Sequence, residues 1–68
     1  MKMLDLDLDE INKLGKITKE EAKQFLEEGE PIVCRTSRRD FHEISIISDL
    51  DRVLSHPEVY DMLEFYIQ

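Results

Sequence analysis

The chain has 68 residues and a formal net charge of −7, with 16 acidic residues against nine lysines and arginines. A chain of this length makes one small domain, residues 1–68, and buries only roughly 60% of its unfolded surface, which leaves little stability for strained catalytic geometry. Cys34 is the only cysteine, so an internal disulfide is excluded, and no cysteine and histidine stand at zinc-finger spacing. We therefore expect no metal and no other cofactor.

Hydropathy and charge also limit the function classes. No apolar run approaches the roughly 20 residues of a membrane span, and no signal peptide is recognisable, so we expect a cytoplasmic protein without a membrane partner. Charge is uneven: residues 1–30 carry five lysines and nine acids, residues 31–47 three arginines and two acids, and residues 48–68 one arginine and five acids. An acidic surface repels nucleic acid and favours basic protein surfaces.

The N-terminal segment MLDLDLDE suggests a calcium loop, because carboxylates stand at alternate positions: Asp5, Asp7 and Asp9. An EF-hand loop also needs a glycine at its sixth position and a glutamate at its twelfth. Counted from Asp5, those positions hold Glu10 and Lys16. The sequence therefore does not match a calcium loop.

Two structures fit this segment. One is a strand whose leucines alternate inward, and the other is a helix that begins at Asp7 or Asp9 and ends at Gly15. The apolar face of that helix would consist of Leu8, Ile11 and Leu14. Their spacing favours the helix, with residues 1–6 as an extended or frayed lead.

A second helix is predicted over residues 19–28. Thr18 and Glu21 form a capping box, in which each side chain accepts a hydrogen bond from the backbone of the other residue. The apolar face consists of Ala22, Phe25 and Leu26. Gly29 supplies a left-handed residue after the helix, and Pro31 prevents its continuation.

Residues 32–36 and 41–47 are rich in β-branched and aromatic residues and flank a short polar connection, which predicts a β-hairpin. The alternation of side chains predicts a buried face that consists of Ile32, Cys34, Ile44 and Ile46. An isolated hairpin is only marginally stable in water, so helices must cover this face.

Two further helices are predicted near the C-terminus. The first is short, begins at Ser48 and ends near Leu54, and the second begins with the capping box of Ser55 and Glu58. The second helix carries an apolar stripe at helical spacing: Val59, Met62, Leu63, Tyr66 and Ile67. The predicted fold class is α+β, a single small domain in which a β-hairpin packs against two to four short helices.

The sequence does not favour an enzyme. The candidate catalytic groups are Cys34, His42 and His56. Cys34 lies in an apolar strand, where a cysteine is typically a small buried hydrophobe, and His42 would neighbour Cys34 or Thr36 only if the strand register allows. No glycine-rich loop accompanies these groups, and His56 lies in a helix-start sequence.

Three surfaces are candidates for binding. The first is acidic and would contact a protein with a basic surface, for instance one that binds nucleic acid: Glu27, Glu28, Glu30, Asp61 and Glu64. The second is the arginine group at the hairpin tip, a contact for phosphate or an acidic partner, or else a solvated turn paired with neighbouring acids: Arg35, Arg38 and Arg39. The third is the C-terminal apolar stripe, which would form a homodimer. Contact with nucleic acid is the least favoured of these, because no aromatic platform accompanies the arginines.

Residues 17–34, ITKEEAKQFLEEGEPIVC, carry a resemblance to a known group. With the hairpin that follows, this stretch resembles small accessory proteins of bacteriophages and prophages, which open with a capped I-T/S-x-E-E-A helix, break at a glycine and continue into a two-stranded hairpin. The resemblance implies a phage or bacterial setting and no catalytic residue. Together with the acidic surface, it leads to the hypothesis of a small phage- or prophage-encoded interaction protein that binds and modulates a host or viral protein.

Overall fold

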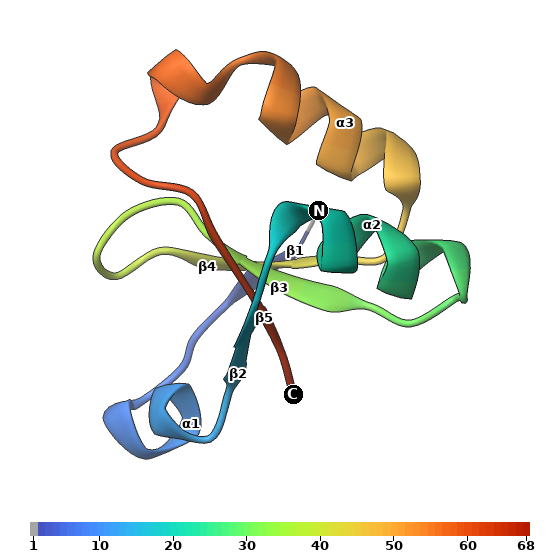
Figure 1. The fold of residues 1–68 in the computed structure, drawn as a ribbon. Helices are drawn as coiled ribbons and strands as arrows, with labels where there is room; N and C mark the ends of the chain where they lie inside the picture. The colour runs from blue at the N-terminus through green and yellow to red at the C-terminus, as the bar shows by residue number, and fades with distance from the viewer. Residues whose placement is uncertain (1) are drawn as a thin grey trace.

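A five-stranded antiparallel sheet forms the centre of the computed structural model, which describes residues 2–68 (Figure 1). Its strands are β1 (Lys2–Leu4), β2 (Gly15–Ile17), β3 (Ile32–Arg35), β4 (Phe41–Ile44) and β5 (Glu64–Ile67), in the spatial order β1-β4-β3-β5-β2. The helical elements are α1 (Leu8–Asn12), α2 (Lys19–Glu27), α3 (Ile47–Ser55) and a 3-10 turn, η1 (Pro57–Val59). The predicted α+β class is confirmed.

Helices α2 and α3 lie on one face of the sheet, the α2–α3 face, and enclose the main core (Figure 1). The register places Ile32 opposite Ile44, and Cys34 opposite both His42 and Phe65. The buried core residues come from both helices and three strands: Ala22, Leu26, Leu50, Val53, Ile32, Cys34, Ile44 and Phe65. The core therefore depends on β5 as well as on the predicted hairpin.

The opposite face of the sheet, the α1 face, also carries buried side chains. Val33 and Phe41 alternate with the core residues of their strands, yet they are only 3% and 1% exposed. Helix α1 lies on this side of the sheet, below β2 in Figure 1, where Leu8 and Ile11 line a groove together with Phe41. The sequence prediction of a single buried face was thus incomplete.

The capping signals around α2 are confirmed. The Glu21 amide donates to Thr18 Oγ1 at 3.1 Å, and the Thr18 amide donates to Glu21 Oε1 at 2.9 Å. The helix ends at Glu27 with Glu28 as its C-cap, and Gly29 follows at φ 84°, a left-handed conformation that favours glycine. Local chemistry therefore marks both ends of this helix, while Ala22 and Leu26 anchor it in the core.

The N-terminal prediction is partly confirmed. Asp7 caps a helix that begins at Leu8, as predicted, but the helix ends at Asn12 and Gly15 begins β2. Leu8 was predicted to point inward, and this was wrong, because its side chain is 75% exposed. Residues 2–4 form β1 against β4, so this part of the predicted lead is extended and not frayed, whereas Met1 lies outside the described residues. Pairing with β1 satisfies backbone groups that β4 would otherwise leave open at its outer edge.

The predicted C-terminal helix is wrong. Residues 57–59 form only the 3-10 turn η1, and residues 64–67 form β5 between β3 and β2. Phe65 and Tyr66 occur in a segment whose apolar residues fit both helical and strand periods, and the two neighbouring strands decide between them by supplying hydrogen-bond partners on both sides. The short helix predicted before this segment is confirmed as α3, but its N-cap is Ile46, which makes no side-chain cap, so the cap predicted at Ser48 is wrong. The capping box predicted for Ser55 and Glu58 is also wrong, because Ser55 Oγ donates to the carbonyl oxygen of Asp51 instead.

The prediction for one residue of the buried hairpin face was also wrong. Ile46 was expected in the core but is 58% exposed, because β4 ends at Ile44 and Ile46 is the N-cap of α3. The other three residues of that face, Ile32, Cys34 and Ile44, are buried as predicted.

Candidate functional site

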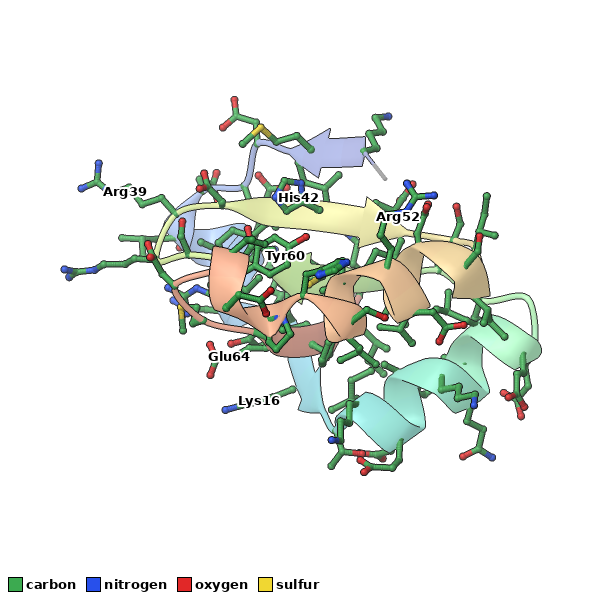
Figure 2. All side chains as sticks on the ribbon, turned by 90° about the horizontal axis from the view of Figure 1, so that it is seen from above. Lys16, Arg39, His42, Arg52, Tyr60 and Glu64 are labelled. Atoms are coloured by element: carbon green, nitrogen blue, oxygen red, sulfur yellow. The ribbon has the colours of Figure 1, made fainter. Side chains whose placement is uncertain are left out.

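An ion cluster on the α1 face joins three strands at Glu64, the first residue of β5. Lys16 Nζ of β2 donates to Glu64 Oε2 at 2.8 Å, and Arg35 Nη1 of β3 donates to Glu64 Oε1 at 3.4 Å. Tyr66 OH donates to the same Oε1 at 3.0 Å. Figure 2 shows Lys16 and Glu64 side by side at the margin of the sheet. The cluster arises because register pairs Arg35 directly with Glu64.

The electrostatics of this cluster favour its charged form. The hydrogen bond from Lys16 lowers the pKa of Glu64, and the nearby Arg35 charge acts in the same direction. The same hydrogen bond raises the pKa of Lys16 above its ordinary value of 10.5. Glu64 is 22% exposed and fully provided with partners, so its carboxylate serves the fold rather than a free acidic surface.

Arg35 is likewise held in place by its own strand and turn. Its guanidinium donates to the carbonyl oxygens of Ser37 at 3.3 Å and Arg38 at 2.6 Å, besides its bond to Glu64. The guanidinium carbon also lies 5.1 Å from the centre of the Phe41 ring, in cation–π range. The structure therefore uses Arg35 to close the β3–β4 connection.

The other two residues of the predicted arginine group remain exposed at the hairpin tip. No ion pair of Arg38 or Arg39 is found within residues 2–68, and Figure 2 shows Arg39 pointing away from the ribbon. Asp40, one of their expected partners, instead accepts a hydrogen bond from Ser37 Oγ at 2.7 Å. These two arginines are the ones that are available for a ligand.

The five acidic residues predicted to bind a partner do not form one surface. Glu27, Glu28 and Glu30 are exposed at the C-terminal end of α2. Asp61 is also exposed, but it lies in the segment between η1 and β5, at the opposite end of the molecule (Figure 1). With Glu64 engaged in the ion cluster, the continuous part of the acidic surface is the end of α2.

The apolar stripe predicted for self-association does not lie on a helix in the structure. Val59 is 68% exposed in η1, whereas Leu63 and Ile67 pack against the core. Tyr66 lies on the α1 face, opposite Val33 and Lys16. These residues, with Met62, therefore do not share one face.

Cys34 and His42 stand directly opposite each other in the sheet, and His42 Nε2 lies 3.1 Å from Thr36 Oγ1, so both neighbours anticipated for His42 are present. Cys34 is fully buried, and this burial raises its pKa to about 11. The thiolate, which is the nucleophilic form, is scarce near neutral pH. Within residues 2–68, no three histidine, cysteine or carboxylate side chains are grouped as metal ligands.

Alkylation of Cys34 should therefore be limited by opening of the fold. In the native protein at about pH 8, we expect iodoacetamide to react at least about a hundredfold more slowly than with the same protein in denaturant, because the thiol is both buried and protonated. Mass spectrometry of timed samples measures both rates. Equal rates would show that Cys34 is accessible.

A groove between α1 and the β3–β4 connection was not anticipated from the sequence. Its volume is about 540 Å³. The lining residues come from the α1 segment and from the hairpin: Asp5, Leu6, Leu8, Ile11, Arg35, Arg38, Arg39 and Phe41. The sequence offered one sign of this groove, which is the apolar Leu8 between two aspartates. That pattern does not reveal which distant segment of the chain faces Leu8.

Helices long and apolar enough to cross a lipid bilayer are not found within residues 2–68. Comparison of the chain with protein-family models, curated proteins and solved structures gives no significant match.

Proposed function

We propose that this chain is a small acidic protein-interaction module that binds a protein with a basic surface and modulates its activity. The observation that carries this proposal is the acidic end of α2, formed by Glu27, Glu28 and Glu30. All three side chains are exposed, and none has an ion-pair partner within residues 2–68. The last turn of α2 contains no basic residue.

This arrangement is unfavourable for the isolated protein. The C-terminal end of a helix carries about half a negative charge, and a further negative side chain there destabilises the helix by about 0.3–1 kcal/mol. Three neighbouring carboxylates also repel one another. A basic surface placed against the end of α2 would remove both penalties, so the charge that weakens the free protein favours the complex.

The partner that fits this chemistry presents clustered lysines or arginines. A surface that binds nucleic acid is one such partner, because the carboxylates would occupy the positions of phosphates, and the module would then act as an inhibitor. The resemblance of residues 17–34 to phage and prophage accessory proteins supports a host or viral protein as the target. The proposal gives the chain no catalytic role.

Affinity capture from a bacterial lysate tests the proposal. The tagged protein should retain a protein with a basic surface, identified by mass spectrometry, and capture should weaken as salt is raised. Glu27→Gln, Glu28→Gln and Glu30→Gln together should reduce capture at least about tenfold, since each charge contact at an interface contributes on the order of 1 kcal/mol.

The matched control changes the net charge equally at exposed sites elsewhere: Asp9→Gln, Asp51→Gln and Glu58→Gln. This control variant should capture the partner almost as well as the original protein. If both variants lost capture equally, net charge and not the end of α2 would cause binding, which would contradict the proposal. Undiminished capture by the α2 variant would also overturn it.

A further inference from the structure

We infer that the groove between α1 and the β3–β4 connection binds an acidic peptide segment that carries one apolar side chain. This site lies on the α1 face and is distinct from the acidic end of α2. Its volume of about 540 Å³ falls in the range of roughly 300–1,000 Å³ that is typical of ligand sites. The inference rests on an apolar floor combined with unpaired positive charge at the rim.

The apolar part of the groove is unusually exposed at one residue. Leu8 stands in the first turn of α1 with 75% of its surface accessible, although it lines the same groove as the half-buried Ile11 and the buried Phe41. Covering a leucine of this kind with an apolar side chain is favourable by about 25 cal/mol for each Å² removed from water. The groove therefore offers an apolar ligand group contacts that the free chain does not supply.

The rim provides the charge complementarity. Arg38 and Arg39 are exposed and have no ion-pair partner within residues 2–68, while Arg35 is held by Glu64 and forms a fixed wall. Planar guanidinium groups bind carboxylates through paired hydrogen bonds. Asp5 also lines the groove and repels anions, so the carboxylates of an acidic segment are favoured beside the arginines and not beside Asp5.

The same residues favour a peptide over nucleic acid. Single-stranded nucleic acid binds where bases stack on exposed aromatic rings. The only aromatic residue that lines this groove is Phe41, which is 1% exposed and carries the Arg35 guanidinium over its ring. A carboxylate and an aliphatic side chain need no such platform.

Nuclear magnetic resonance titration tests the inference with defined probes. The probe is the peptide Glu-Asp-Glu-Leu-Glu-Asp-Glu, with a serine in place of leucine in its matched twin, and an oligo(dT) strand represents the other ligand class. We expect the leucine peptide to shift the amide signals of Leu8, Ile11, Arg38 and Arg39. The serine twin should bind about tenfold more weakly, because it lacks the leucine side chain that the groove would bury.

Variants separate the groove from general charge effects. Arg38→Glu plus Arg39→Glu should abolish the shifts, whereas Lys19→Glu plus Lys23→Glu, an equal charge change on exposed sites of α2, should leave them in place. Leu8→Ser changes an exposed residue and should weaken binding without unfolding the chain. Equal binding of both peptides, shifts outside the groove, equal shifts with oligo(dT), or an unaffected arginine variant would each overturn the inference.

Discussion

Replacing Phe65 with alanine should lower the free energy of unfolding by about 3–5 kcal/mol, the usual cost of truncating a buried phenylalanine. Phe65 is 5% exposed and lies in the interior strand β5, opposite Cys34 on one side and Ile17 on the other. The total stability of a domain of this size is about 3–10 kcal/mol. Phe65→Ala should therefore leave a large part of the protein unfolded at room temperature.

The control for this substitution is Val59→Ala. Val59 is 68% exposed in η1, so its truncation should change the stability by no more than about 0.5 kcal/mol. In a C-terminal helix Val59 would lie on the apolar face and Phe65 outside it, so Val59→Ala would then be the more destabilising substitution. Urea unfolding followed by circular dichroism measures both variants, and a larger loss for Val59→Ala would contradict the strand.

Glu64→Gln should lower the free energy of unfolding by about 1–3 kcal/mol, because it removes the charge that accepts hydrogen bonds from charged groups. The glutamine leaves Arg35 half-buried without its counter-charge and leaves Lys16 facing a neutral group. Glu58→Gln is the control, since Glu58 is exposed and its contact with His56 is 3.6 Å long. The control should change stability by at most about 0.5 kcal/mol. Equal losses in the two variants would mean that the ion cluster does not stabilise the sheet.

The pH dependence of this difference gives a second measurement. The folded-state pKa of Glu64 lies below its ordinary value of 4.5, so the unfolded chain takes up the proton first as the pH falls. The stabilisation is therefore complete above the unfolded value and is lost as the pH drops through the folded one. The gap between the original protein and Glu64→Gln should be wide at about pH 7 and should narrow as the pH falls below the ordinary value of 4.5. A constant gap would show that the charge of Glu64 is not the cause.

At high pH the stability of the protein depends on Lys16, and it falls as the pH rises. Lys16 has a raised pKa, so its share of the stabilisation is present below the ordinary value of 10.5 and is lost as the pH rises above it. Solvent screens this share, because the Lys16 side chain is 64% exposed.

Elements specified by local chemistry could be predicted from the sequence. The capping box of Thr18 and Glu21 and the left-handed Gly29 fix the two ends of α2 without help from distant residues. The alternation around Ile32 and Ile44 likewise identified the β3–β4 hairpin. Each of these signals lies within a few residues of the structure that it determines.

Features that depend on distant pairing could not be predicted. Residues 64–67 fit a helix as well as a strand, and only hydrogen bonding to β2 and β3 selects the strand. The same pairing brings Glu64 to Lys16, 48 positions away in the chain, and so converts a predicted surface carboxylate into part of the fold. The groove depends on the approach of α1 to the hairpin tip, which no periodicity encodes.

The acidic end of α2 is the feature on which the proposed function depends, and one paired measurement tests it most directly. The variant with Glu27, Glu28 and Glu30 changed to glutamine should have its free energy of unfolding and its capture of the basic partner determined in the same buffer. We expect stability to rise by about 0.5–2 kcal/mol, because helix-end repulsion is removed, while capture falls at least about tenfold. A variant that is less stable and still captures the partner would contradict the proposal, since the carboxylates would then serve the fold and not a partner.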